Sequence, residues 1–136
     1  MTDIDYRISP PLGDIILNRL YADTWPGHEE REFERVLARS VAYVGAFDED
    51  DVLVGFVYVA WDGGAHAFVL EPTVLPSHRN RGIGTELIRL AAREASDAGA
   101  EWLHVDYEPG LERFFASCGF RPTSASVMRL PRPAST

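Results

Sequence analysis

The segment from Pro76 to Thr85 has the clearest pattern for binding chemistry in this sequence. It reads Pro-Ser-His-Arg-Asn-Arg-Gly-Ile-Gly-Thr and joins an apolar extended stretch to an amphipathic helix. Glycine lets the backbone approach a ligand, and the first turn of a helix leaves several N–H groups unpaired at its positive end. Arg79 and Arg81 add two full positive charges. The pattern predicts an anion site, although it lacks the Gly-Lys-Ser/Thr ending of a P-loop and the third glycine of a dinucleotide-binding turn.

Three polar residues interrupt stretches that otherwise read as apolar strands. Glu71 follows an apolar run over residues 67–70, and His104 and Asp106 alternate with apolar neighbours. A period of two places His104 and Asp106 on one strand face, about 7 Å apart. A histidine oriented by a carboxylate is a candidate general base, and its ordinary pKa suits neutral pH. The pattern also fits a half-exposed face with a hydrogen-bonded histidine. Glu71 fits a base, a carboxylate that binds an ammonium group, or a surface residue.

The turn Arg79-x-x-Gly82-x-Gly84 is similar to the pyrophosphate-binding motif of the GNAT superfamily of N-acetyltransferases. The similarity continues through Val74-x-Pro76, a helix over 81–98, a strand over 102–106 and the segment 114–120, which reads Phe-Phe-Ala-Ser-Cys-Gly-Phe. It covers residues 65–130 well and the first 60 loosely. The resemblance implies an α/β (α+β) fold: a mixed, mostly antiparallel central sheet with helices on both faces. It also implies a splay between strands four and five, where the pantetheine arm of coenzyme A inserts.

The resemblance further implies an acyl-CoA-dependent N-acyltransferase, with acetyl-CoA as co-substrate and no metal. The acetyl group would pass by direct attack to a primary amine of a small molecule or peptide. Glu71 is the favoured base, because the fourth strand borders the thioester in that family; His104, Asp106 and Tyr107 are the other catalytic candidates. A backbone N–H near Val74 would polarise the thioester carbonyl. The implied cofactor-binding residues are Val74, Leu75, Arg79, Arg81, Gly82, Ile83, Gly84, Thr85, Phe114 and Phe115.

The sequence departs from the family pattern at Phe115. Many members have a tyrosine there, whereas phenylalanine has no proton to give to the departing thiolate. Three alternatives remain open: Tyr107 or Cys118 substitutes, water protonates the thiolate, or catalysis is lost and an acyl-CoA-binding sensor module remains. Because a thiolate is a good leaving group, a missing acid should slow the reaction without forbidding it.

Hydrophobic periodicity and turn residues predict the elements that would position these side chains. We expect strands over 6–8, 41–47, 52–61, 65–74 and 102–106, and helices over 12–21, 28–40, 81–98 and 110–118. The first helix should bury Leu12, Ile15, Ile16 and Leu20, and residues 121–130 have room for two short strands. These elements fit one domain over residues 1–130, followed by a flexible tail over 131–136.

The composition limits the class of protein. A chain of 136 residues that is 46% hydrophobic can bury a single core. Without a long apolar run or a basic leader we expect a soluble, cytoplasmic protein with no membrane partner, and one cysteine agrees with a reducing compartment. A formal net charge of −8 disfavours nucleic acid and suits a cationic acceptor. The resemblance leaves open a homodimer through the late strands.

Overall fold

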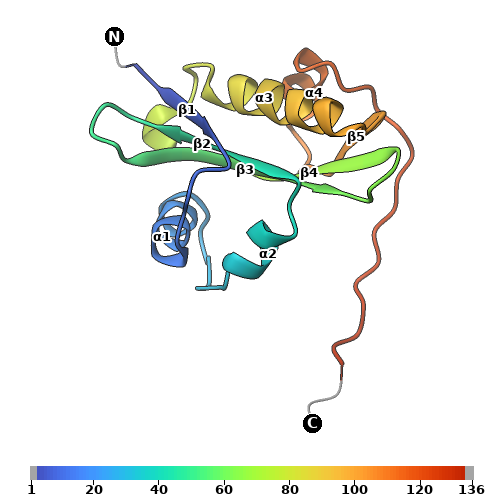
Figure 1. Cartoon of the computed structure of the whole chain (residues 1–136), viewed down its shortest axis with the longest axis horizontal. Coiled ribbons are helices and arrows are strands. Elements are labelled where there is room, and N and C mark those ends of the chain that lie inside the picture. Colours follow the sequence, from blue (N-terminus) through green and yellow to red (C-terminus); the bar gives the residue numbers. More distant parts are fainter. Residues whose placement is uncertain (1–2, 134–136) are drawn as a thin grey trace.

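The computed structural model describes residues 3–133, and a five-stranded sheet forms the centre of this part of the chain (Figure 1). The strands follow the order β1-β2-β3-β4-β5 across the sheet, and only β4 and β5 pair in parallel. The strands are β1 (Asp5–Ile8), β2 (Ala42–Phe47), β3 (Leu53–Trp61), β4 (His66–Val74) and β5 (Trp102–Val105). The helices are α1 (Asp14–Thr24), α2 (Glu34–Ala38), α3 (Ile83–Ala98) and α4 (Glu112–Ser117), with a 3-10 turn η1 (Pro76–His78). The predicted mixed, mostly antiparallel α/β (α+β) sheet is confirmed.

Helices cover both faces of the sheet, as predicted: α3 and α4 lie on one face, and α1 and α2 on the other (Figure 1). Each face has its own apolar core. The α3 side includes Val44, Val57, Val59, Val69, Leu87, Ile88 and Phe115. The α1 side includes Leu17, Leu20, Tyr21, Phe33, Phe56 and Tyr58. Because successive strand residues point to opposite faces, β3 serves both cores and is apolar along most of its length.

Helix α3 connects the core to the predicted anion-binding turn. Its buried stripe contains Ile83, Leu87, Ile88, Leu90, Ala91 and Ala95. Gly82 before the helix and Gly99 after it have φ values of 81° and 115°, a left-handed conformation that favours glycine. The stripe and both glycines confirm the predicted helix to within two residues. Within residues 3–133, no helix combines the length and the apolar character needed to cross a membrane.

Strand β4 is paired unequally on its two sides. Its pairing with β5 runs from His66 opposite Trp102 to Val69 opposite Val105, where β5 ends. On the other side β4 pairs with β3 as far as Val74. The second half of β4 therefore lacks a neighbour from β5, which is the splay predicted between strands four and five.

A bulge lies in the half of β4 that does not pair with β5. Phe56 of β3 faces Thr73 and Tyr58 faces Leu70, so Glu71 and Pro72 together oppose a single β3 residue. Glu71 has φ of 47°, which is rare for a residue other than glycine. A bulge of this kind bends a strand and changes the direction of its side chains. It places Glu71 at the edge of the splay.

The predicted buried stripe of the first helix was right at Leu20, and at Leu12, which packs on the same core, but wrong at Ile15 and Ile16. In α1 the buried residues include Leu17, Leu20 and Tyr21, whereas Ile15 is 83% exposed and Ile16 is 46% exposed. Both stripes have helical spacing, so periodicity alone does not choose between them. The choice is made largely by packing on the sheet, because the buried side of α1 shares a core with Phe47 and Leu53 at the β2–β3 turn and with Phe56 and Tyr58 of β3.

The predicted helix over 28–40 was wrong over residues 28–33. The Asn18 side chain accepts a hydrogen bond from the Arg31 N–H at 2.9 Å and donates one to the Arg31 carbonyl at 2.8 Å. Asp14 Oδ1 accepts from the N–H groups of Phe33 and Glu34 at 3.0 and 3.1 Å. Side chains of α1 thus take backbone groups that a longer helix would use, and α2 begins only at Glu34.

The two strands expected within 121–130 were also wrong, because residues 121–133 form neither helix nor strand. This segment extends beyond the body of the domain (Figure 1), and Val127, Met128 and Leu130 are 87%, 78% and 72% exposed. Pro122 and Pro131 lack the N–H group that a sheet requires. Residues 134–136 of the expected tail lie outside the described residues, and the single domain over 1–130 stays a prediction.

Replacement of Asn18 by alanine should lower the free energy of unfolding by about 2 kcal/mol, because a nearly buried side chain would no longer satisfy the Arg31 backbone. Urea titration of both proteins measures the difference. Arg19→Ala, at an exposed position on the same helix, is the control and should change stability by less than about 0.5 kcal/mol. Equal losses in the two variants would contradict this role for Asn18.

Candidate functional site

The turn between β4 and α3 leaves backbone N–H groups available. Asn80 and Gly82 have φ values of 63° and 81°, and no side chain caps the first turn of α3. The first hydrogen bond of the helix runs from the Glu86 N–H to the Gly82 carbonyl at 3.1 Å. The N–H groups before Glu86 have no partner within the helix, as at any helix start. This end of α3 can therefore hold an anion.

The predicted side chains of this turn have different surroundings. Arg79 and Arg81 are exposed, and neither forms an ion pair with the described residues. Thr85 is exposed on the first turn, whereas Ile83 is 2% exposed and can offer a ligand only its backbone. A side chain at Gly84 would meet the Phe114 ring at 3.2 Å. Gly84 therefore lets α4 pack closely against α3.

The open edge of β4 supplies further backbone groups. The Leu75 N–H donates to the Val54 carbonyl at 2.9 Å, toward β3. Because N–H groups alternate in direction along an extended strand, the Val74 N–H points to the side that β5 has left. Both residues are half-buried. A ligand in the splay can accept a hydrogen bond from Val74.

Glu71 at the bulge is held by an arginine from the segment between α1 and α2. Arg31 Nη1 donates to Glu71 Oε1 at 3.1 Å, and Arg31 Nη2 forms a second bond with Oε2. The guanidinium carbon lies 4.4 Å from the centre of the Phe33 ring and 5.2 Å from that of Tyr21. The hydrogen bonds that Arg31 donates to Glu71 raise the pKa of Arg31, so this group stays cationic.

The backbone of the bulge is fixed by side chains of α1 and of β4 itself. Tyr21 donates its hydroxyl to the Glu71 carbonyl at 3.2 Å, and the Thr73 hydroxyl donates to the same oxygen at 2.9 Å. Trp25 Nε1 donates to the Thr73 hydroxyl oxygen at 3.1 Å. These bonds stabilise the positive φ of Glu71.

Two phenols beside Glu71 keep their protons at neutral pH. Burial raises the pKa of Tyr58 to about 12, and the negative charge of Glu71 adds to the effect. Burial, followed by the charge of Glu71, also raises the pKa of Tyr21. Both groups can donate a hydrogen bond, and neither can act as a base. Sequence reasoning missed both Tyr58 and Arg31. Tyr58 could have been noticed as a phenol within an otherwise apolar strand. Arg31 lies 40 positions from Glu71, and no local pattern points to their pairing.

The other catalytic candidates, His104, Asp106 and Tyr107, have different surroundings from Glu71. His104 Nε2 lies 2.8 Å from His66 Nδ1, and the Phe68 ring stacks on His104 at 4.7 Å. Asp106 is exposed, and among the described residues it forms no hydrogen bond with His104. Tyr107 stacks on Phe115 at 4.6 Å, within the aromatic packing on the α3 side. The predicted alternation holds, but His104 takes a histidine partner from β4 in place of Asp106.

The last helix places its aromatic residues in the core. Phe115 is 2% exposed and packs edge-on against Phe114 and Phe120 at centroid distances of 4.9 and 5.7 Å. Cys118 is half-buried, and burial raises the pKa of its thiol. A tyrosine at position 115 would have to place its hydroxyl beyond this packing.

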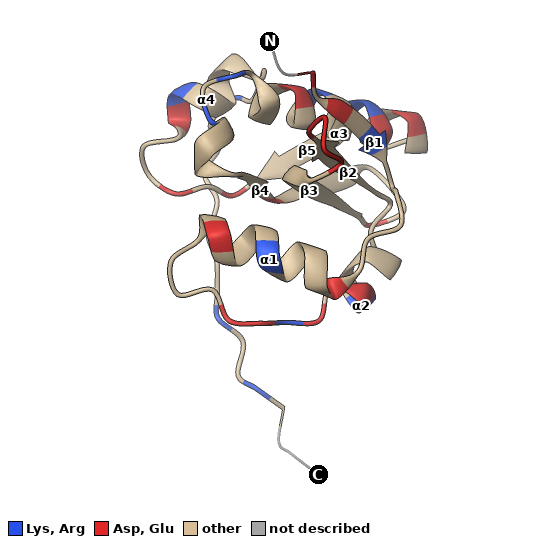
Figure 2. Ribbon diagram, turned by 90° about the vertical axis from the view of Figure 1, so that its left-hand side faces the viewer, with Lys and Arg blue, Asp and Glu red and all other residues tan. Residues whose placement is uncertain are grey.

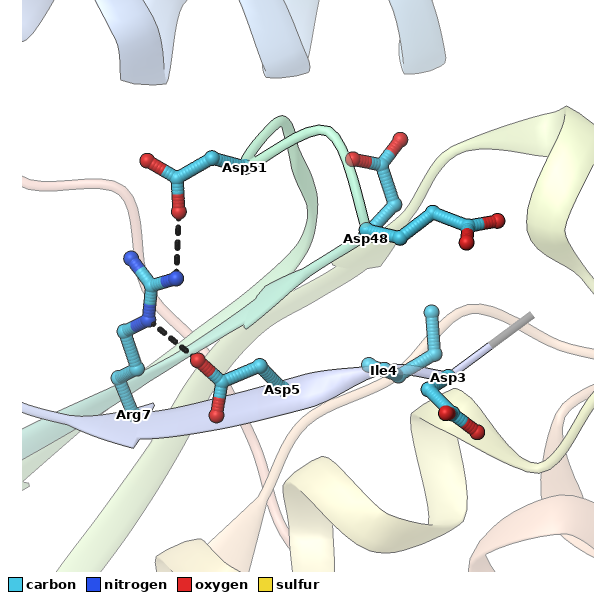
Figure 3. Close-up of a pocket in the computed structure, with 7 residues that line it drawn as sticks. Asp3, Ile4, Asp5, Arg7, Asp48 and Asp51 are labelled. Carbon is cyan, nitrogen blue, oxygen red and sulfur yellow. Dashed lines mark hydrogen bonds and ion pairs between the residues drawn. The ribbon is translucent and has the colours of Figure 1, made fainter.

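A separate group of charged residues lines a hollow on the surface, between the start of β1 and the β2–β3 turn (Figure 3). Arg7 pairs there with Asp5 at 2.8 Å and with Asp51, and Asp48 accepts hydrogen bonds from the N–H groups of its own turn.

Acidic residues are spread over several elements, and the segment between α1 and α2 contains both acidic and basic residues (Figure 2). Among the described residues, no three histidine, cysteine or acidic side chains are grouped to hold a metal ion.

Comparison of the sequence with known proteins gives one consistent result. Residues 15–120 match the model of the acetyltransferase (GNAT) family. An uncharacterized N-acetyltransferase, ycf52-like, from Prochlorococcus marinus is 26% identical over 99 residues, which are 71% of this chain and 55% of that protein. Mycothiol acetyltransferase from Nocardia farcinica is 30% identical over 89 residues, which are 65% of this chain and 29% of that protein. The chain thus spans about half of the first relative and under a third of the second.

Solved structures show the same fold. A GNAT-family acetyltransferase from Streptococcus pneumoniae superposes with a TM-score of 0.81 at 23% identity, covering 96% of this chain and all of that one. The aminoglycoside N-acetyltransferase AAC(6')-Iy, solved in complex with CoA, gives 0.74 at 20% identity and covers 97% of each chain. At these identities the likeness concerns the fold, whereas the family model matches most of the sequence itself. The chain belongs to the acetyltransferase (GNAT) family.

Proposed function

We propose that this protein is an acetyl-CoA-dependent N-acetyltransferase that acts on a primary amine of a small molecule or peptide. One observation carries the proposal: the uncapped start of α3, with Arg79 and Arg81 beside it, directly follows the strand edge that β5 leaves open. An anion site and an adjoining slot suit the pyrophosphate and pantetheine of coenzyme A. A relative of the same fold was solved with CoA.

The residues of the turn and of β4 would bind different parts of coenzyme A. The N–H groups of Gly82, Ile83, Gly84 and Thr85, with the guanidinium groups of Arg79 and Arg81, would hold the pyrophosphate. The backbones of Val74 and Leu75 would border the pantetheine. Phe114, which packs over Gly84, and Phe115 behind it would fix the position of the turn.

The chemistry requires an unprotonated amine, because an ammonium group has no free electron pair. Glu71 would accept the proton, and the Val74 N–H would donate to the thioester oxygen as charge develops there. The acceptor nitrogen would bond to the acetyl carbon and lose its second proton to water, the C–S bond would break, and the thiolate would take a proton from water, Tyr107 or Cys118. His104, with Asp106 and Tyr107 on the same segment, is the alternative group for proton transfer.

A second candidate function is an acyl-CoA-binding sensor module without catalysis, favoured by the buried Phe115 where many relatives have a tyrosine. Under this alternative the protein binds acetyl-CoA and releases no thiol with any amine. If Phe115→Tyr created activity in an inert protein, the sensor function would be supported.

We also propose a cytoplasmic location, supported by the single cysteine and by the need for acetyl-CoA. The negative net charge supports an amine acceptor over nucleic acid. A homodimer through residues 121–130 stays a prediction.

Replacement of Arg79 or Arg81 by glutamine should weaken CoA binding about tenfold or more, because each guanidinium would lose a charge-assisted contact with the pyrophosphate. Isothermal titration with CoA and with pantetheine, which has no pyrophosphate, measures the effect. Pantetheine affinity should stay unchanged. Arg89→Gln, further along α3 and paired with Glu86, is the control. Equal CoA affinity in all four proteins would contradict an anion site at this turn.

Glu71→Gln should lower kcat by about 100-fold or more and leave the Kd for acetyl-CoA within twofold, because glutamine cannot accept the proton of the ammonium group. Thiol release over a panel of amines gives kcat, and calorimetry gives the Kd. Unchanged turnover in this variant would remove Glu71 from the mechanism.

A further inference from the structure

The carboxylate proposed as the base is occupied before any acceptor arrives. Arg31 binds both oxygens of Glu71, and the two side chains are 38% and 40% exposed. An acceptor ammonium group that takes over both oxygens displaces this guanidinium. Binding of such an acceptor separates the two charges, and each of them then needs a new partner.

An uncompensated charge at this position would lose two hydrogen bonds. Tyr58 and Tyr21, which flank Glu71, are 7% and 3% exposed, so one side of the pair faces the core while the two side chains stay partly open to water. A plain cationic amine would satisfy Glu71 and leave Arg31 without its partner. Water would replace only part of the two-pronged contact that Arg31 makes with Glu71.

We propose that Arg31 and Glu71 together form the acceptor site for a free α-amino acid, with the ammonium group on Glu71 and the carboxylate on Arg31. This inference rests on the proposed N-acetyltransferase function and names its substrate class. A zwitterion has no net charge, so its binding leaves the charge of the cluster unchanged. Each of the two side chains exchanges one partner of opposite charge for another.

Arg31 is arranged to make this exchange. Its backbone is fixed by Asn18 at both the N–H and the carbonyl, while its side chain lies against the rings of Phe33 and Tyr21. The anchored backbone lets the guanidinium move without moving the segment. The aromatic faces stabilise the cation as it leaves Glu71.

Direct contact between the two charges favours an α-carboxylate over a more distant anionic group. In an α-amino acid the ammonium and carboxylate groups are bonded to one carbon, and a small separation of Arg31 from Glu71 admits both. A planar carboxylate also matches the two-pronged geometry that Arg31 already uses with Glu71.

The proposed reaction balances without another reactant. Glu71 takes one proton from the ammonium group, and the amine nitrogen then bonds to the acetyl carbon as the C–S bond breaks. A second nitrogen proton is lost as the amide forms, and the thiolate takes one proton. The products are an N-acetyl amino acid, CoA and one released proton, and the carboxylate stays on Arg31 throughout.

The test compares amino acids with the amines that lack only the carboxylate. Thiol release from acetyl-CoA is measured with the full chain for phenylalanine and phenethylamine, tyrosine and tyramine, lysine and cadaverine, and glycine and methylamine. In the best pair, kcat/KM for the amino acid should exceed that for the amine by about tenfold or more. Arg31→Gln should remove this preference mainly by raising KM for the amino acid, and Arg31→Lys should keep part of it.

Arg7→Gln is a matched control. Arg7 also bridges two partners, Asp5 and Asp51, and lies 3.9 Å from the centre of the Phe47 ring, but it sits on β1 away from the splay. Its loss should leave the ratio of amino acid to amine unchanged. Equal or better use of the decarboxylated amines, or an unchanged ratio in Arg31→Gln, would overturn the inference.

A failure of the proposed function is distinguishable from a failure of this inference. If no acceptor releases thiol, calorimetry with CoA and each amino acid of the panel still measures the acceptor site. Amino acid binding that Arg31→Gln abolishes and Arg7→Gln retains would support the inference. No amino acid binding in the presence of CoA would overturn it.

Discussion

The arrangement of the site depends on one strand with unequal partners. Strand β4 pairs with β3 as far as its last residue, but with β5 only from His66 to Val69. Pairing with β3 on both sides of the bulge keeps β4 in the core, while the missing half of the β5 pairing leaves backbone groups that a ligand can use. The chain then turns directly into α3, so the open strand edge and the free N–H groups of the helix start belong to one continuous segment.

The other half of the site comes from distant parts of the chain. Tyr21, Trp25 and Arg31 lie on α1 or just after it, and all three reach the bulge of β4 through hydrogen bonds to Glu71 or Thr73. The segment after α1 is in turn shaped by Asn18 and Asp14. The first third of the chain therefore shapes the side proposed for the acceptor, and β4 with α3 shapes the side proposed for coenzyme A. Under this proposal, a change in α1 would alter acceptor choice and leave the turn at Gly82 intact.

Sequence predicted the parts of this molecule that depend on neighbouring residues. The Arg79 to Thr85 turn, the amphipathic helix that follows it and the strands over 41–47, 52–61 and 65–74 follow from local spacing and turn chemistry, and the structure contains each of them. Contacts between distant residues were not predictable: the Arg31–Glu71 pair, the side-chain bonds that keep residues 28–33 out of a helix, and the His66 partner of His104. The stripe of α1 failed in part for the same reason, because its choice of face is made by its neighbours.

Glu71 occupies a backbone conformation that glycine would adopt without strain. Two demands on this position therefore oppose each other: the chemistry proposed for the site needs a carboxylate, whereas the bulge itself would be relaxed by glycine or asparagine. In a lineage that kept the fold but no longer transferred acyl groups, substitution at this position would relieve strain at no functional cost. The residue type at this position in related chains would then indicate whether selection has maintained catalysis or only the fold.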